Sequence, residues 1–264
     1  MRPETNIPPR LDVAQEDIPA VLLVGGMGTR LQSILPSTPK ALAQVGNMPF
    51  LQLLVLQLRS QGIRRMVMCT GHLADQIEEE FGDGHRWGIA IDYSKESGPL
   101  GTAGAVKLAE RYLSQVSDFL VMNGDSFLEL DFRQFIHFHR HHGGLISMAV
   151  RRVLDATRYG TVQLDTLDRV AGFHEKTGAQ VPGMVNGGVY VFNRAILEHI
   201  PQGPASLEKD LFPRLLEQGV VYALEQHGMF IDIGTPEDYA RAQELFDSLS
   251  RAAVRESQTG CRER

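Results

Sequence analysis

The residues best suited to chemistry lie in a glycine-rich segment near the N-terminus. Residues 25–31 read Gly-Gly-Met-Gly-Thr-Arg-Leu after an apolar run, and Pro39-Lys40 follow. Glycines leave backbone N–H groups unshielded, so such a turn can cradle phosphate oxygens. Arg30 can clamp phosphates through two nitrogen donors, and Lys40 can add a point charge. The segment predicts a phosphate-binding loop, and the alternative is a tight turn that carries incidental charges.

Two common phosphate loops do not fit this segment. The dinucleotide-binding fingerprint needs a third glycine where Leu31 stands, and the P-loop needs a Gly-Lys-Ser/Thr sequence that the chain lacks. The loop therefore matches neither of these nucleotide sites.

Two aspartates lie on or after apolar strands. Asp125 follows the run Phe119–Met122, at the carboxyl end where open α/β sheets bind ligands. A carboxylate there suits Mg²⁺, which takes one or two carboxylates plus substrate phosphates. Asp232 lies on the run Met229–Ile233, just before a predicted helix. It could also be an ordinary turn residue, although Thr235 is the better N-cap.

The glycine-rich segment resembles the signature of the sugar-1-phosphate nucleotidyltransferases, a family written roughly as Gly-Gly-x-Gly-Thr-Arg-Leu followed by Pro-Lys. The resemblance continues in the family's order from about residue 20 to 245. Its further blocks are Pro99–Gly104, Asn123-Gly124-Asp125, Glu175-Lys176, Asn186-Gly187-Gly188 and Asp232–Pro236. Within the family, the chain looks most like the short D-glycero-D-manno-heptose 1-phosphate guanylyltransferases, which have no C-terminal β-helix.

This resemblance implies a role for each block. Asp125 and Asp232 would hold one Mg²⁺ ion. The nucleoside triphosphate would contact Gly25, Gly26, Gly28, Thr29, Arg30, Glu96, Gly101 and Thr102. The sugar 1-phosphate would contact Asn123, Gly124, Glu175, Lys176, Asn186 and Gly187. The catalytic residues would be Arg30, Lys40, Asp125, Lys176 and Asp232.

Three of these blocks also have plainer explanations. Small residues over 101–104 could let a flat base approach helix N–H groups, or could simply allow close helix packing. Glu175-Lys176 could be a solvated charge pair, and Asn186-Gly187-Gly188 could be a β-bulge. The sequence leaves these alternatives open.

Glu96 indicates which base is bound. It lies three residues before Pro99, where relatives that take uracil or thymine tend to carry Gln. The N1–H and N2–H₂ groups of guanine are adjacent donors, which a carboxylate can accept together and an amide cannot. Glu96 therefore favours guanine, with a solvated turn residue as the alternative.

The implied reaction needs no general base, because the acceptor phosphate is already anionic near pH 7. Catalysis must bring two polyanions together and stabilise an in-line displacement at the α-phosphorus. We expect Arg30 to neutralise the leaving pyrophosphate, Lys40 the α-phosphate region and Lys176 the sugar phosphate. The expected reaction transfers GMP from GTP to a heptose 1-phosphate, for capsule or lipopolysaccharide precursor synthesis.

Other functions are weighed against this one. A mannose 1-phosphate guanylyltransferase and a uridylyl- or thymidylyltransferase remain alternatives. A regulatory subunit that senses nucleotide sugars would be expected to have lost a metal aspartate or a phosphate-binding base, and all are present. A small-molecule kinase lacks its P-loop lysine motif here.

A histidine pair at helical spacing is a weaker signal. His137 and His141 are four residues apart, but no third metal ligand is apparent. Gly143-Gly144 marks a helix end, where a partly charged histidine is favourable, so we do not assign a metal site.

Apolar runs alternate with segments of helical period, which predicts a three-layer, Rossmann-like α/β fold with a mostly parallel mixed sheet. The family resemblance implies the nucleotide-diphospho-sugar transferase type of this fold. The expected strands are 19–24, 65–70, 89–93, 118–122, 145–150, 160–164, 169–174, 185–192, 220–224 and 230–233. The expected helices are 49–61, 73–81, 102–112, 131–141, 207–217 and 236–249. We expect one domain over 18–250, with a nucleotide half over 18–130 and a sugar half over 131–250.

Composition sets outer limits on function. The chain has 264 residues, a formal charge of −6 and a pI near 5.8, which argues against a nucleic-acid partner. A signal peptide and a membrane-spanning apolar run are both lacking, so we expect a cytoplasmic protein, and a homodimer is possible. Cys69 and Cys261 are expected to be free thiols. Residues 1–17 predict a loose arm and 251–264 a polar tail.

Overall fold

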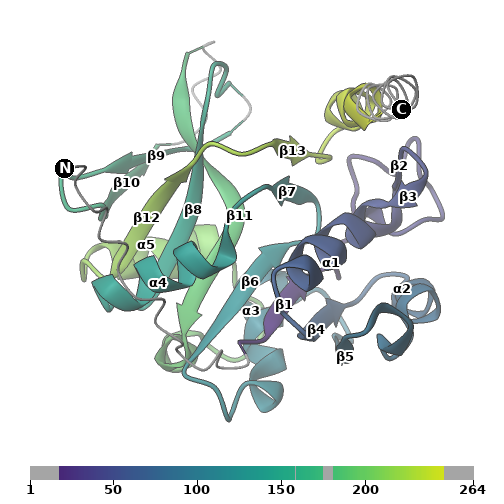
Figure 1. The fold of residues 1–264 in the computed structure, drawn as a ribbon, viewed down its shortest axis with the longest axis horizontal. Coiled ribbons are helices and arrows are strands. Elements are labelled where there is room, and N and C mark those ends of the chain that lie inside the picture. The colour runs from purple at the N-terminus through teal and green to yellow at the C-terminus, as the bar shows by residue number, and fades with distance from the viewer. Residues whose placement is uncertain (1–17, 158, 175–180, 247–264) are drawn as a thin grey trace, which may run out of the picture.

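The computed structural model describes residues 18–157, 159–174 and 181–246. The predicted arm 1–17, the predicted tail 251–264 and the Glu175-Lys176 block lie outside the described residues. In the described part, a nine-stranded mixed sheet lies between two layers of helices (Figure 1). This arrangement confirms the predicted α/β fold class.

The elements follow the predicted order. The strands of the large sheet are β1 (Ala20–Leu23), β4 (Arg65–Thr70), β5 (Ala90–Lys95), β6 (Asp118–Asn123), β8 (Ile146–Val153), β9 (Thr161–Leu164), β10 (Val170–His174), β11 (Gly183–Asn193) and β12 (Val221–Gln226). Two small antiparallel pairs are β2 (Gln44–Val45) with β3 (Met48–Pro49), and β7 (Ser126–Leu128) with β13 (Phe230–Asp232). The helices are α1 (Phe50–Ser60), α2 (Ala74–Phe81), α3 (Gly101–Leu108), α4 (Phe132–His142), α5 (Phe212–Leu216) and a C-terminal helix over 236–246.

The order of strands creates a switch point beside β1. Strands β6, β1, β4 and β5 are neighbours in that order and all run parallel. The chain moves outward from β1 to β4 and β5 and then returns to β6 on the other side of β1. The loops that follow β1 and β6 therefore diverge, which opens a crevice at the carboxyl edge of the sheet. Beyond β6, strand β11 is antiparallel and joins β8 and β9 to the parallel strands.

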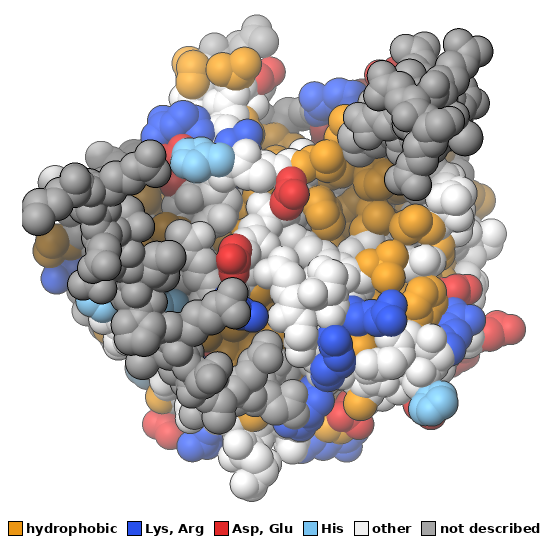
Figure 2. Space-filling model, in the orientation of Figure 1, with side chains coloured by type: hydrophobic (Ala, Val, Ile, Leu, Met, Phe, Trp, Pro, Cys, Tyr) orange, Lys and Arg blue, Asp and Glu red, His pale blue; other side chains and the backbone are white. Residues whose placement is uncertain are grey.

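Alternation along β1 fills both layers of the core. Ala20 and Leu22 pack with residues of α1, α2 and α4, whereas Val21 packs with residues of α3 and α5. A strand covered on both faces must be apolar at every position, which is why this run contains no polar residue. On the face shown in Figure 2, apolar side chains gather over α1 and β7 below the C-terminal helix. None of the helices in the described ranges has the length and apolar character that crossing a bilayer requires.

Predicted and observed elements differ mainly at their ends. The strand over 65–70 has the predicted bounds, and the predicted helix over 102–112 divides into α3 and a 3₁₀ turn, Ala109–Tyr112. The helix predicted over 207–217 begins as a π turn, Leu207–Leu211, before α5. The pattern gave no signal for β7 or for the β2–β3 pair, because strands of two or three residues carry too little periodicity.

Candidate active site

A cavity of about 600 Å³ lies at the carboxyl edge of the parallel strands. The loops after β1, β4, β5 and β6 line it, as the switch point requires. The predicted site residues that line it are Gly25, Gly26, Gly28, Lys40, Glu96, Gly101, Thr102, Asn123, Gly124 and Asp125. Residues far apart in the sequence are thus brought to one cavity.

Each glycine of the loop after β1 lies in a different structural environment. Gly28 has a φ of 59°, a left-handed conformation that other residues adopt reluctantly. A Cβ on Gly25 would lie 3.0 Å from the Glu96 carboxylate and 3.1 Å from the Gly71 nitrogen. A Cβ on Gly26 would meet no atom within 4 Å, so that backbone is open to the cavity. The loop is therefore tight against the sheet at Gly25 and exposed at Gly26.

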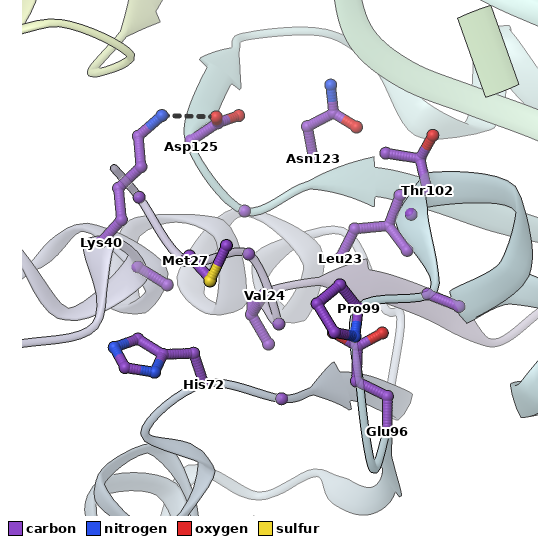
Figure 3. A pocket seen from close by; sticks show the side chains of 18 of the residues that line it. Leu23, Val24, Met27, Lys40, His72, Glu96, Pro99, Thr102, Asn123 and Asp125 are labelled. Atoms are coloured by element: carbon purple, nitrogen blue, oxygen red, sulfur yellow. Dashed lines mark hydrogen bonds and ion pairs between the residues drawn. The ribbon is translucent and has the colours of Figure 1, made fainter. Parts of the chain in front are cut away.

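Lys40 and Asp125 form an ion pair at one end of the cavity. The Lys40 Nζ atom lies 2.6 Å from Asp125 Oδ2, and the lysine side chain is only 15% exposed (Figure 3). Lys40 begins the short 3₁₀ helix η1 (Lys40–Leu42), whose Ala41 and Leu42 side chains are buried. The buried turn holds the base of the lysine, and its long stem carries the charge to the aspartate.

The β7–β13 ribbon brings the second aspartate beside the first. Asp232 is the register partner of Ser126, the residue after Asp125, and the Ile233 N–H donates to the Asp125 carbonyl at 3.0 Å. Burial and the negative charge of Asp125 raise the pKa of Asp232 to about 6, although the N–H of Gly234 donates to its carboxylate at 2.6 Å. Two carboxylates that the sequence placed far apart are therefore neighbours, and they offer an all-oxygen donor set of the kind Mg²⁺ prefers.

The helix after Asp232 begins as predicted. The Thr235 hydroxyl accepts the N–H of Asp238 and donates to its carboxylate, so Thr235 is the N-cap. Asp232 also borders a second, smaller cavity of about 320 Å³ between β13 and the C-terminal helix. Asp232 thus borders a cavity and lies beside Asp125, and an ordinary turn residue need do neither.

Glu96 lies across the cavity from the ion pair. Figure 3 shows Lys40 and Asp125 at one end and Glu96 beneath Pro99 at the other. Its Oε2 atom accepts the N–H of Leu100 at 3.1 Å, and burial raises the pKa of its carboxyl. Its Oε1 atom lies 2.5 Å from where a Cβ on Gly71 would be, so glycine there makes room for the carboxylate. Glu96 is therefore a partly desolvated carboxylate fixed by a hydrogen bond, and not a solvated turn residue.

The small residues at the start of α3 pack against a neighbouring segment, and some of them also border the cavity. The N–H groups of Ala103 and Gly104 both donate to the carbonyl of Ala205, at 2.9 and 3.1 Å. A Cβ on Gly101 would lie 2.6 Å from that same carbonyl oxygen. The small side chains thus let the 203–206 segment pack on the start of α3, as close packing would. Gly101 and Thr102 still border the cavity.

Asn186 and Gly187 lie at a β-bulge in β11, where the pairing with β8 shifts register between Asn186 and Val189. The Asn186 amide donates to Tyr190 at 2.6 Å and accepts the N–H of Gly188 at 3.0 Å. The bulge anticipated as the plainer explanation is present. Asn186 and Gly187 do not line the main cavity.

Two predicted residues of the glycine loop lie outside the lining of the cavity. Thr29 and Arg30 are exposed and do not line the cavity. Conversely, His72 and Ser97 line it and were not predicted. Each follows a parallel strand, β4 or β5, so the rule that singled out Asp125 could have found them.

His139 and His142 of α4 are used in packing, whereas His137 and His141 are exposed. The buried His139 ring bonds Ser147 Oγ at 2.9 Å, and His142 packs against Tyr222 with ring centroids 4.8 Å apart. Among the described residues, no group of three or more His, Cys, Asp or Glu side chains is placed to hold a metal.

Comparisons with known proteins agree with this geometry. A family model described as "Nucleotidyl transferase" matches residues 19–248. The chain is 36% identical to the mannose-1-phosphate guanylyltransferase catalytic subunit beta of Drosophila pseudoobscura pseudoobscura, over 88% of this chain and 63% of that protein. It is also 36% identical to a mannose-1-phosphate guanylyltransferase of Mycobacterium tuberculosis, over 87% of this chain and 64% of that protein. The chain thus spans less than two thirds of the length of these curated relatives.

A solved structure resembles the whole fold. HddC from Yersinia pseudotuberculosis complexed with GMP-PN is 35% identical, with a TM-score of 0.78. The match covers 87% of this chain and 99% of that one.

Proposed function

The chain belongs to the nucleotidyl transferase family, and on that premise we propose that it transfers GMP from GTP to a sugar 1-phosphate and releases pyrophosphate. The acceptor that we propose is D-glycero-D-manno-heptose 1-phosphate, with mannose 1-phosphate as the alternative. The product would be an activated sugar for capsule or lipopolysaccharide synthesis, made in the cytoplasm. The observation that carries the proposal is the Lys40–Asp125 ion pair at one end of a glycine-lined cavity, with Asp232 beside Asp125.

The cavity suits a nucleoside triphosphate in size and polarity. Its volume of about 600 Å³ lies in the usual range for small-molecule sites. The open backbone at Gly26 and the ammonium of Lys40 favour phosphates at one end, and the Glu96 carboxylate favours a base with adjacent donors at the other. A nucleotide would therefore lie along the carboxyl edge of the sheet.

Guanine is supported by the remaining hydrogen-bonding capacity of Glu96. One carboxylate oxygen accepts the N–H of Leu100, and each carboxylate oxygen can accept more than one donor. The carboxylate can thus still receive guanine N–H groups. The solved relative complexed with GMP-PN and the guanylyltransferase names of the curated relatives agree with this choice of base.

Asp125 and Asp232 would hold the Mg²⁺ ion. The two carboxylates repel each other, as the raised pKa of Asp232 shows, and a divalent cation would relieve that repulsion. Their oxygen atoms suit a hard cation that completes its coordination shell with phosphates. Bound there, such an ion would neutralise phosphate charge during the displacement.

The chain's own residues would then orient and neutralise the substrates. Lys40 would meet the α-phosphate region, Arg30 the departing pyrophosphate and Lys176 the sugar phosphate. Arg30 lies on an exposed part of the loop, so it would have to turn toward the cavity when phosphates bind. Proton abstraction is not needed, because the attacking phosphate oxygen carries its own negative charge.

The test is pyrophosphate release over a grid of GTP, ATP, UTP and dTTP against heptose, mannose and glucose 1-phosphates. We expect the highest kcat/KM with GTP. Glu96→Gln should reduce the preference for GTP over UTP by roughly 10- to 100-fold, since it removes one charge-assisted acceptor. The matched control is Glu79→Gln on the exposed side of α2, which should change nothing. A native preference for UTP or dTTP would overturn the choice of base, and nucleotide binding without turnover of any pair would favour a sensor.

A further inference from the structure

Lys40 is bonded to a carboxylate that a metal ion would also need. Its Nζ atom lies 2.6 Å from Asp125 Oδ2 in a partly buried ion pair, in which the lysine side chain is 15% and the aspartate side chain 39% exposed (Figure 3). A contact this short is a charge-assisted hydrogen bond and not merely a nearby charge. The ammonium group therefore occupies one of the oxygens through which Asp125 could bind a cation.

The same ammonium group lies close to the second carboxylate. A Cβ built on Gly234 would lie 2.6 Å from Asp232 Oδ1 and 3.7 Å from Lys40 Nζ. Both atoms thus lie beside Gly234, which puts no side chain of its own between them, and the charge of Lys40 acts on Asp232. The arrangement is one ammonium group facing two carboxylates, so Lys40 offsets about half of their charge.

We propose that Lys40 is an internal counter-ion that competes with divalent metal for the Asp125–Asp232 pair, so that metal binds tightly only when nucleotide phosphates draw Lys40 away. This inference rests on the metal site of the proposed function. It gives Lys40 a second role, because the residue then sets the order in which metal and nucleotide bind as well as contacting a phosphate.

The competition follows from simple electrostatics. Two cations held by the same carboxylate repel each other strongly where water is partly excluded. Lysine carries a point charge on a flexible stem, so it can exchange a carboxylate for a phosphate without any movement of the backbone. A phosphate that attracts Lys40 would therefore raise the affinity for metal, and by linkage bound metal would raise the affinity for the nucleotide.

The test measures metal affinity without nucleotide and without turnover. Mn²⁺ is titrated into the full-length protein, and the free aqueous ion is followed by electron paramagnetic resonance. Neutral replacements, Lys40→Gln and Lys40→Met, should each tighten Mn²⁺ binding by at least about tenfold, because they remove the competing charge. Lys40→Arg keeps the charge and should show no such gain.

Two further variants separate the possible outcomes. Lys107→Gln removes an ion pair of similar burial, 2.9 Å to Glu110 and away from the aspartates, and should leave Mn²⁺ affinity unchanged. Asp125→Asn should weaken Mn²⁺ binding, which would show that the metal uses this site. If Asp125→Asn binds Mn²⁺ more weakly but both neutral Lys40 variants bind it as the wild type does, the metal site stands and the competition is refuted. Wild-type affinity in Asp125→Asn would overturn the metal site itself, and the competition with it. Circular dichroism confirms that each variant is folded, and two neutral replacements guard against the failure of one.

Discussion

Replacing Asp232 by asparagine should make the protein more stable and much less active. Burial and the charge of Asp125 raise the pKa of Asp232 from 3.8 to about 6, so the folded state disfavours the ionised carboxylate. An asparagine has nearly the same shape, and its oxygen can still accept the N–H of Gly234 that now bonds Asp232. The substitution therefore removes a destabilising charge and leaves the local hydrogen bond in place.

The size and sign of the effect follow from linkage. A rise in pKa from 3.8 to about 6 corresponds to about 3 kcal/mol of destabilisation when the group is fully ionised. Because the folded pKa is the higher one, this destabilisation is absent below about pH 4, grows as the pH rises toward 6, and is complete above that. The loss of the attraction to Lys40 is already part of the net shift. We expect a gain of about 1–3 kcal/mol at pH 8 and about half of that at pH 5.

Thermal and urea unfolding in a chelating buffer measure the gain, and pyrophosphate release measures turnover. A gain of 1 kcal/mol raises Tm by about 2–4 °C for a domain of this size. Turnover should fall by ~10²-fold or more, the scale of losing a main electrostatic stabiliser. Asp92→Asn, an exposed aspartate on β5, is the matched control and should stay within about 0.5 kcal/mol. Equal or lower stability of Asp232→Asn at pH 8, or a gain that does not depend on pH, would refute the reasoning.

Other residues yield further predictions. Asp125→Asn should also reduce turnover by ~10²-fold or more with the fold intact, and near-normal turnover at limiting Mg²⁺ would contradict a shared metal site. Arg30→Ala should lower kcat more than sugar affinity, whereas Lys176→Ala should raise KM for the sugar phosphate; steady-state kinetics with the opposite pattern would mean that the two roles are exchanged. Burial, and to a smaller degree the charge of Glu96, raises the pKa of the Cys69 thiol to about 12. In a Cys261→Ser background, native protein at pH 8 should therefore react with iodoacetamide at least ~10²-fold more slowly than protein in urea, and equal rates would contradict the packing.

Much of the site was accessible from the sequence because its parts are local. A run of apolar residues followed by glycines specifies a buried strand and a tight loop without reference to any other part of the chain, as at β1 and residues 25–28. Asp125 could be assigned to a ligand-binding edge because the carboxyl ends of parallel strands share one edge. The N-cap at Thr235 likewise depends only on neighbouring residues. Local geometry and burial can be predicted from the pattern of residues in the sequence. Which distant residues contact each other cannot.

The tertiary structure decided which of these parts meet. Periodicity shows that a strand is buried, but it does not say that the three-residue strand β7 pairs with β13 and so sets Asp232 beside Asp125. From the sequence, the N–H groups at the start of α3 were predicted to contact a nucleoside. In the structure, the N–H groups of Ala103 and Gly104 donate to the Ala205 carbonyl instead. Likewise, Lys40 is directed to Asp125 by the register of distant elements. Such pairings depend on which surfaces are complementary once the sheet has formed, and that complementarity arises only when segments distant in sequence are packed together.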